Sequence, residues 1–307
     1  MHLTNVTRGI TDNSKRVKFK MKHFVIKHKR GLLLGLILLF VVLFLVFINY
    51  YNTQATDSTK ESLQMLANEK AAQVNLFLES KREELSILGS MNVFKEAILY
   101  PNDSSKIGIA RNRINELKGI IPGISILTNE GIVLVGDVDL PGTDYSGQPY
   151  FSLAEKKVVF ERYYDSLRKG DYYAVVGPIY DNLENNKIIG TIAFDIELNK
   201  ISEIMAGNQE KGTTEVYLID LIDKTGLLLS ASKFVDQTNK KGVLIQTGSS
   251  EGAEECLGDL EKYGRDGYIE EHEEEIPKYL NYMGNEVYGA HAYVPAIMGC
   301  VIAESAG

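Results

Sequence analysis

An uninterrupted apolar run constrains this chain more than any other feature. From Leu32 to Ile48 every residue is apolar or glycine, and Gly31 before it and Tyr50 after it lengthen the stretch. It then has about the 20 residues that an α-helix needs to cross a bilayer. A cleaved signal peptide is the alternative, but the run begins only at Leu32 and no small-x-small cleavage site follows it directly. We therefore expect a transmembrane helix at residues 31–51.

The segment before this run, residues 1–30, is strongly basic and has Asp12 as its only acidic residue. Lysine and arginine close to a membrane span are retained in the cytoplasm. We therefore expect residues 1–30 to be cytoplasmic and residues 52–307 to be extracytoplasmic. Nucleic-acid binding by the basic segment is the other interpretation, but juxtamembrane charge explains these residues without a partner.

The extracytoplasmic part is more acidic than the net charge of -8 for the whole chain, because the basic segment lies elsewhere. An acidic surface argues against a nucleic-acid partner. The two cysteines, Cys256 and Cys300, both lie in this part. They can form a disulfide only if they are close in space, which the sequence does not show.

Residues 52–100 are predicted to form a long helix. Between Gln54 and Leu99 there is no proline, and apolar residues recur at spacings of three, four and seven or eight, which places them in one stripe. The stripe consists of Leu63, Leu66, Val74, Phe77, Leu78, Leu85 and Leu88. It predicts either a homodimer through this helix or packing against the chain's own domain, and both can hold at different heights.

The residues after Pro101 change from helical to strand patterns. We expect a short helix at 106–117, a hairpin at 124–136 turning at Asn129-Glu130-Gly131, strands at 158–164, 172–180 and 187–196, and a helix at 198–205. After a polar connector the same plan recurs, with a hairpin at 215–232 and a strand-turn-strand unit at 279–305. The fold class predicted is α+β, with two antiparallel sheets behind one long helix.

Several stretches together resemble the double Cache family of sensor domains. In the first half these are "ISILTNEGIVLVG", "SGQPYFSLAEKK" and "KIIGTIAFDIEL"; in the second they are the segment 215–226, "NEVYGAHAYVP" and "GCVIAES". The likeness covers residues 32–305. It implies two PAS-like antiparallel sheets carried on the long helix, with a membrane-distal module at 101–207 and a membrane-proximal module at 208–305.

The resemblance also implies how the chain is used. Such domains lie outside the cell between two membrane spans of a receptor, and we expect the chain to stop just before its second span. The implied cytoplasmic output is a histidine kinase, a chemotaxis receptor module or a cyclic-dinucleotide cyclase. We favour the histidine kinase on the family-level expectation alone.

Enzyme chemistry finds little support in the extracytoplasmic part. His272 and His291 are its only histidines, and no metalloprotease, nucleophile-elbow or phosphate-loop motif occurs. The stretch "IEEHEEEIP" around His272 offers carboxylates, but a metal site needs converging rather than consecutive ligands. We expect no catalytic residue, no metal and no cofactor in this part, and we expect a small-molecule site instead.

The resemblance places that site in the distal module, on a loop ending in an arginine-x-aromatic-aromatic pattern and on an aspartate of the last strand. Here the loop positions are Gln148, Tyr150 and Phe151, and the aspartate is Asp195. Phe151 can equally pack the core, and Asp195 can equally cap the helix at 198. Tyrosines of the neighbouring strands complete the prediction, and period-two alternation turns about half of them inward. These are Tyr163, Tyr164, Tyr172 and Tyr173, of which we select Tyr163 and Tyr173.

Gln148 departs from the amino-acid-binding members, which carry an arginine there. Thr143 likewise stands where they have a tyrosine. Without the guanidinium the two-bond clamp on a carboxylate is lost. The candidate ligands are therefore an amine, an amino-acid-like or other polar molecule, or an organic acid held in a different way. A module that recognises an envelope protein, with its cavity filled by its own side chains, is the alternative function.

Overall fold

A computed structural model describes residues 6–154, 157–165, 168, 170–181, 187–206, 214–222, 225–228, 244–245, 251–263 and 278–306. The chain divides into two compact units, residues 1–59 and residues 60–307. One helix, α1 (Val6–Ser90), runs through both units. Each unit is described by itself.

In the first unit, α1 carries the apolar run found in the sequence. It is the one candidate membrane span among the described residues, with a mean hydropathy of 2.2 over its most apolar stretch and none of that stretch buried. Large side chains along it are exposed, for example Phe40 at 70%. A long apolar helix that buries none of these side chains in protein has the length and composition of a membrane span.

In the second unit, α1 packs one face into the core. Its buried apolar side chains recur every three, four or seven positions and are Leu63, Ala67, Ala71, Val74, Leu78, Leu85 and Leu88. The sequence predicted one helix continuing to Leu99, and that was wrong: α1 ends at Ser90. Met91 is extended and separates α1 from α2 (Asn92–Leu99). The end of α1 lies beside the first sheet: a Cβ at Gly89 would be 3.6 Å from the backbone oxygen of Pro178.

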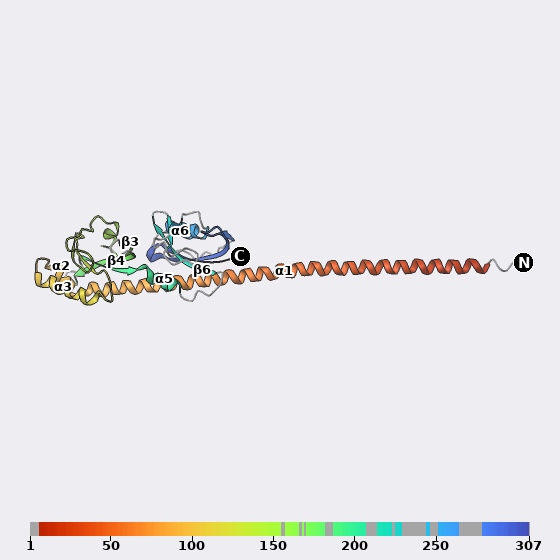
Figure 1. Ribbon diagram of the computed structural model, residues 1–307, viewed down its shortest axis with the longest axis horizontal. Coiled ribbons are helices and arrows are strands. Elements are labelled where there is room, and N and C mark those ends of the chain that lie inside the picture. Colours follow the sequence, from red (N-terminus) through yellow and green to blue (C-terminus); the bar gives the residue numbers. More distant parts are fainter. Residues whose placement is uncertain are drawn as a thin grey trace. The chain divides into compact units, whose positions relative to one another are not determined.

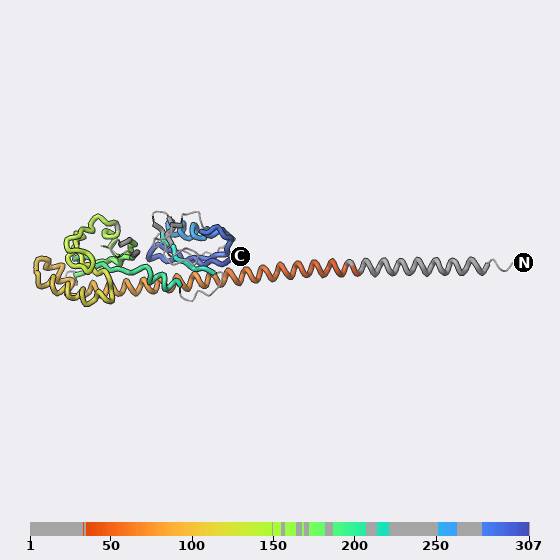
Figure 2. Tube along the Cα trace, viewed as in Figure 1, coloured from red at the N-terminus to blue at the C-terminus, as the bar shows by residue number. Residues whose placement is uncertain are grey.

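After α2 the chain turns back along α1. The helix α3 (Ser104–Leu117) begins at Asp103, whose side chain accepts hydrogen bonds from the backbone N–H groups of Ser105 and Lys106. Figure 2 traces this return, from α1 through α2 and α3 into the strands. The helix predicted at 106–117 is confirmed.

The first sheet has five antiparallel strands in the order β2-β1-β5-β4-β3. Its strands are β1 (Ser125–Thr128), β2 (Val133–Gly136), β3 (Val159–Asp165), β4 (Gly170–Asp181) and β5 (Lys187–Glu197). The short helix α4 (Pro149–Ala154) precedes β3, and α5 (Leu198–Ala206) follows β5. The predicted hairpin and all three later strands are confirmed.

The second sheet has six antiparallel strands in the order β8-β7-β6-β11-β10-β9. Its strands are β6 (Thr214–Ile222), β7 (Thr225–Leu228), β8 (Leu244–Ile245), β9 (Tyr279–Leu280), β10 (Glu286–Val294) and β11 (Gly299–Ala306). A 3₁₀ turn, η1 (Pro295–Ile297), joins β10 to β11. In the region of the hairpin predicted at 215–232, β6 pairs with β7 in antiparallel fashion, and residues 223–224 between them lie outside the described residues.

The two sheets share one plan, which confirms the internal repeat. In each, a hairpin donates its first strand, β1 or β6, to pair with the last strand of the module, β5 or β11. The remaining strands then follow in reverse chain order, β4 and β3 or β10 and β9. Figure 1 shows the two sheets in succession, joined through α5. The α+β double-sheet fold predicted from the sequence is therefore confirmed.

One helix of the second half was not foreseen from the sequence. The helix α6 (Glu251–Tyr263) covers one face of the second sheet with Ala253, Cys256, Leu257 and Leu260. Cys256 and Cys300 form a disulfide that ties α6 to β11. The question that the sequence left open about these two cysteines is thus answered.

Candidate functional site

The first sheet presents two different faces because side chains alternate along each strand. One face packs on α1 and includes Tyr173, Val175, Phe194 and Ile196. The other face, which we call the α4 face, includes Val159, Ala174, Val176 and Ala193, with Ala154 of α4 packed on it. The polar residues of interest lie on this second face.

Asp195 is the buried carboxylate of the α4 face. It lies opposite Ala174 in the register of β4 and β5 and is only 8% exposed. The loop before β1 closes over it: the backbone N–H of Asp195 donates to Pro122, and a Cβ at Gly123 would fall 1.8 Å from Asp195 Oδ2. Gly123 has φ +69°, so both its conformation and its missing side chain are needed for this contact.

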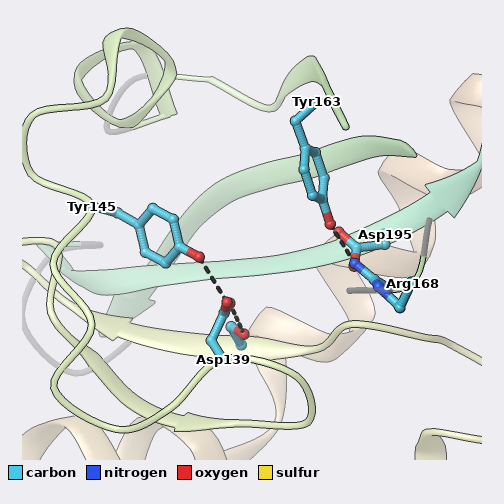
Figure 3. Close-up of polar contacts among 6 residues, drawn as sticks. Asp139, Tyr145, Tyr163, Arg168 and Asp195 are labelled. Carbon is cyan, nitrogen blue, oxygen red and sulfur yellow. Dashed lines mark hydrogen bonds and ion pairs between the residues drawn. The ribbon is translucent and has the colours of Figure 1, made fainter. Parts of the chain in front are cut away.

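Arg168 supplies the partner of this carboxylate. Its Nη2 donates to Asp195 Oδ2 at 2.7 Å and to the Tyr163 hydroxyl oxygen at 2.6 Å. Its guanidinium carbon lies 4.0 Å from the centre of the Tyr172 ring. Figure 3 shows Tyr163, Asp195 and Arg168 pointing at one another from different strands and the intervening turn. The sequence analysis missed Arg168 because no motif marks it.

The charge state of Asp195 is set by competing effects. Burial raises the pKa of its carboxyl to about 6, while the hydrogen bonds from Tyr163 and Arg168 and the charge of Arg168 act in the opposite direction. Burial likewise raises the pKa of Tyr163. At neutral pH the arrangement is an ionised carboxylate paired with a guanidinium and joined to a neutral phenol.

A second polar group adjoins the first. Asp139 accepts hydrogen bonds from the Tyr145 hydroxyl and the Ser125 hydroxyl, both at 2.7 Å. Figure 3 draws this contact beside the Asp195 group. Burial is the largest cause of the raised pKa of Tyr145, and Asp139 adds to it. Tyr145 lies two positions after Thr143, so a tyrosine is available in this loop although not where the family comparison placed it.

The loop residues named from the sequence divide into three kinds. Gln148 is exposed and sits in the turn before α4. Phe151 is buried against Leu127 and Val133 and packs the core. Tyr150 is half-buried on the α4 face, and its hydroxyl makes no hydrogen bond with the part of the chain described here. Burial raises the pKa of Tyr150 to about 12, and Asp139, Glu161 and Asp195 add to the effect. Tyr150 therefore lies near these acidic groups, whereas the side chain of Gln148 is exposed to solvent.

Tyr173 is not brought together with the other predicted residues. It is 1% exposed on the opposite face of β4, where its hydroxyl donates to Asp220 Oδ2 of β6 at 2.7 Å. The neighbouring Tyr172 faces Arg168 instead and stacks on Tyr163, with ring centres 5.9 Å apart. The strand register thus selects Tyr163 and Tyr172, and leaves Tyr173 in the core. We define the distal polar cluster as Asp139, Tyr145, Tyr150, Tyr163, Arg168 and Asp195.

A cavity of about 270 Å³ lies elsewhere in the same unit, between the end of α1 and β4. Its lining includes Leu85, Gly89, Lys157, Pro178 and Tyr180. It does not include any residue of the distal polar cluster. Tyr180, which lines this cavity, therefore serves as a control position in the experiments below.

The second sheet has a polar cluster of its own on the face covered by α6. Glu304 is 2% exposed and accepts hydrogen bonds from the hydroxyls of Tyr217 at 2.8 Å and Tyr279 at 2.9 Å. It lies opposite Glu215, which accepts from Tyr282. Burial raises the pKa of Glu304, and the two tyrosines oppose that effect. His272 of the sequence analysis lies outside the described residues, and no cluster of three metal-ligating side chains occurs within them.

Comparison with known proteins gives this geometry a family. The Cache domain family dCache_1 matches residues 48–303. The chain belongs to this family. The resemblance inferred from the sequence is thereby confirmed, and both sheets fall inside the matched range. No curated protein matches the chain closely enough to add a relative by sequence.

Solved structures of sensor domains are similar in fold to this Cache domain. The sensor domain of the V. cholerae histidine kinase DctB has a TM-score of 0.57 at 13% identity, over 82% of this chain and 98% of that one. The ligand-binding domain of the Pseudomonas aeruginosa PAO1 amino acid chemoreceptor PctC, in complex with GABA, gives 0.55 at 13% identity over 80% and 99%. That of the Pseudomonas fluorescens chemoreceptor CtaA with L-leucine gives 0.53 at 11% identity over 81% and 95%. At these identities the likeness establishes the fold.

Proposed function

We propose that this Cache domain is the small-molecule-sensing part of a transmembrane receptor, and that the ligand binds at the distal polar cluster. Cache-domain proteins of the same fold include sensor domains that bind GABA and L-leucine. Those ligands are properties of the relatives. What this chain contributes is its own set of buried polar groups at one place on the first sheet.

The observation that carries the proposal is the burial of Asp195 among tyrosines. Burying a carboxylate until it is 8% exposed costs free energy unless hydrogen bonds or an opposite charge compensate for its lost hydration. Here the surroundings are the Tyr163 hydroxyl, Arg168 and, nearby, the Tyr150 hydroxyl, which has no hydrogen bond with the described residues. Convergent polar groups on a mostly apolar face are typical of small-molecule sites, and perturbed pKa values often accompany them.

The proposed arrangement of the receptor follows the chain. Residues 1–30 are cytoplasmic, 31–51 cross the membrane, and the rest of α1 up to Ser90 forms the helical stalk. The distal module lies at 101–207 and the proximal module at 208–305. Ligand binding changes the packing of the distal module on α1, and α1 passes that change to the membrane, in a homodimer formed through the same helix. Such transmission requires that the ligand have different affinities for two packing states.

The output of the receptor is proposed on the family comparison. A histidine kinase is favoured, since the sensor domain of DctB is among the similar structures. A chemotaxis receptor is the alternative, because PctC and CtaA are chemoreceptors. The sensing part itself is proposed to be non-catalytic.

A thermal-shift screen of the full chain in lipid nanodiscs tests the proposal. The panel contains amines, amino acids, organic acids and purines. We expect at least one class to raise the melting temperature, and we expect the rise to disappear in Tyr150→Ala and in Asp195→Ala. Tyr180→Ala is the control, because Tyr180 is on β4 but lines the separate cavity. Failure of every class would favour a module that recognises an envelope protein, and loss of the shift in Tyr180→Ala alone would place the ligand in that cavity.

A further inference from the structure

Two buried glutamates lie side by side on the second sheet. Glu304 of β11 is the direct partner of Glu215 of β6, and each is 2% exposed. Side chains at directly opposed positions project from the same face, with Cβ atoms about 4.5 to 5.5 Å apart. Two negative charges at such positions repel each other, and burial strengthens the repulsion. One of these two carboxyls is therefore a candidate for holding a proton.

The hydrogen bonds single out Glu304. Its Oε1 accepts from the hydroxyls of Tyr217 at 2.8 Å and Tyr279 at 2.9 Å. Its Oε2 is buried and makes no hydrogen bond with the part of the chain that the structure describes. In Glu215, by contrast, both oxygens accept from the Tyr282 hydroxyl at 2.9 Å. An ionised carboxylate carries charge on both oxygens, whereas a protonated carboxyl with its carbonyl at Oε1 and its proton at Oε2 fits this one-sided arrangement.

No counter-ion faces Glu304 within the described residues. On β10 its direct partner is Gly289, and the ring of His291 contacts a tyrosine of the same strand. Lys278, next to β9, pairs with Glu286. The charged side chains of α6 are not buried, and they are Glu251, Glu254, Glu255, Asp259, Glu261 and Lys262. The groups that act on Glu304 are acidic or neutral, and they are Glu215, Tyr217, Tyr279 and Asn281.

These surroundings favour the neutral form of the carboxyl. Burial raises the pKa of Glu304, and the charge of Glu215 adds to that effect. Tyr217, Tyr279 and Asn281 act in the opposite direction. The folded chain therefore holds a proton at this position more tightly than an exposed glutamate does.

Tyr279 connects this carboxyl to the layer that covers it. Its ring is 4% exposed, and its hydroxyl lies between β10 and α6. A Cβ at Gly289 of β10 would fall 1.9 Å from the Tyr279 hydroxyl oxygen, and a Cβ at Gly252 of α6 would fall 2.8 Å from it. Water can hydrate an ionised Glu304 only if this tyrosine or α6 moves. Ionisation therefore favours looser packing of α6 and β9, because a buried charge without a counter-ion gains from hydration.

We propose that Glu304 is a proton-binding site of the proximal module, with the proton on Oε2, and that loss of this proton loosens α6 and β9 from the second sheet. When the O–H bond breaks, a base in the surrounding water takes up the proton and the carboxylate keeps the electron pair. The pH of the surrounding solution is thus an input of this Cache domain, separate from any ligand of the distal polar cluster.

Infrared spectroscopy of the full chain in nanodiscs tests the proton site, because protonated and ionised carboxyls have distinct carbonyl bands. All proteins carry Asp195→Asn, which removes a second carboxyl whose pKa burial raises. We expect one protonated carboxyl to titrate at a higher pH than exposed glutamates, whose pKa is about 4.3. Its band should vanish in Glu304→Gln. Glu254→Gln changes an exposed glutamate of α6 and is the matched control, so it should keep the band.

A second variant tests the hydrogen bond to the carboxyl. The Tyr279 hydroxyl stabilises the ionised form, so Tyr279→Phe should move the midpoint of the band upward by about one pH unit. This variant also decides the matter if Glu304→Gln does not fold. A midpoint that Tyr279→Phe leaves in place, or a band that survives Glu304→Gln, overturns the proton site.

Hydrogen–deuterium exchange tests the loosening. We expect the amides of residues 251–263 to lose protection as the pH rises through the midpoint of the band, after correction for the intrinsic pH dependence of exchange. The loss should be absent in Glu304→Gln, which stays neutral, and α3 serves as the internal control. A band that titrates while the protection of α6 stays constant overturns the loosening. Neither measurement uses a small-molecule ligand, so neither result bears on the distal polar cluster.

Discussion

Tyr173 and Asp220 join the two sheets through a buried hydrogen bond of 2.7 Å from the tyrosine hydroxyl to the carboxylate. On β4, the residues on either side of Tyr173 face the other way: Tyr172 contacts Arg168, and Ala174 lies opposite Asp195. One strand therefore contacts the distal polar cluster on one face and the second sheet on the other. A shift of β4 on ligand binding would move Tyr173, and would therefore act directly on its hydrogen bond to Asp220 in the second sheet.

Removing this hydroxyl should weaken the fold and spare the ligand site. We expect Tyr173→Phe to lower the free energy of unfolding by about 2 kcal/mol, because a buried carboxylate loses a donor. Urea unfolding measures the loss. Ligand binding should remain, since Tyr173 does not face the cluster. Tyr180→Phe is the control on the same strand, where the ring is 39% exposed and little change is expected. A Tyr173→Phe variant that folds as stably as the wild type but cannot bind ligand would contradict this assignment.

Gly123 should tolerate no side chain. An added Cβ would meet Asp195 Oδ2 at 1.8 Å, and the φ of +69° is strained for alanine. We expect Gly123→Ala to cost about 1 to 3 kcal/mol in stability and to displace the carboxylate from Arg168. Gly119→Ala is the matched control, because no atom lies within 4 Å of its added Cβ. Equal melting temperatures and equal ligand affinity for the two variants would show that the contact has no importance.

Asp195 should make stability depend on pH in a predictable direction. Burial raises its folded-state pKa from 3.8 to about 6. The folded chain therefore holds a proton more tightly than the unfolded chain, and this carboxyl's contribution to stability is lost as the pH rises from about 4 to about 6. The loss amounts to about 3 kcal/mol. Between these pH values, the free energy of unfolding should decline less in Asp195→Asn than in the wild type. An identical decline in both proteins would assign the effect to other groups.

The disulfide should contribute to the stability of the second sheet. Cys256 and Cys300 are 44 residues apart in sequence, and closing a loop of that length corresponds to about 4 kcal/mol in the chain-entropy description. We expect reduction with dithiothreitol to lower the free energy of unfolding by that amount, and therefore to lower the urea concentration at the midpoint of unfolding. The double variant Cys256→Ala/Cys300→Ala should start at the lower midpoint and be insensitive to the reductant. A wild-type midpoint that does not move on reduction would mean that the bond adds nothing.

Most of the fold could be predicted from sequence patterns with a fixed period. Alternation and turn residues predicted the hairpin at Gly131 and the strands β3, β4 and β5. The end of α1 at Ser90 could not be read from the apolar stripe, because no proline separates the stripe from Leu99 and because Phe94 and Ala97 of α2 are buried as well. The helix α6 is marked in the sequence by Ala253, Cys256, Leu257 and Leu260, which recur at helical spacing.

The candidate site was less predictable than the fold. It depends on the register of β3 against β4 and on how far one long side chain extends. Alternation shows that half of the tyrosines on β3 and β4 face one side, but only the pairing of Tyr163 with Tyr172 shows which half. Tyr173 was therefore assigned to the wrong face for joining Asp195. Arg168 lies in a turn without a motif, and its importance arises only when the long side chain reaches Asp195.

A crystal structure of this Cache domain with the ligand that gives the largest thermal shift tests the central claim most directly. The account predicts the ligand on the α4 face beside Tyr150, with a polar atom about 3 Å from a side chain of the distal polar cluster. A ligand bound in the cavity beside Tyr180 or at the second sheet would contradict the account.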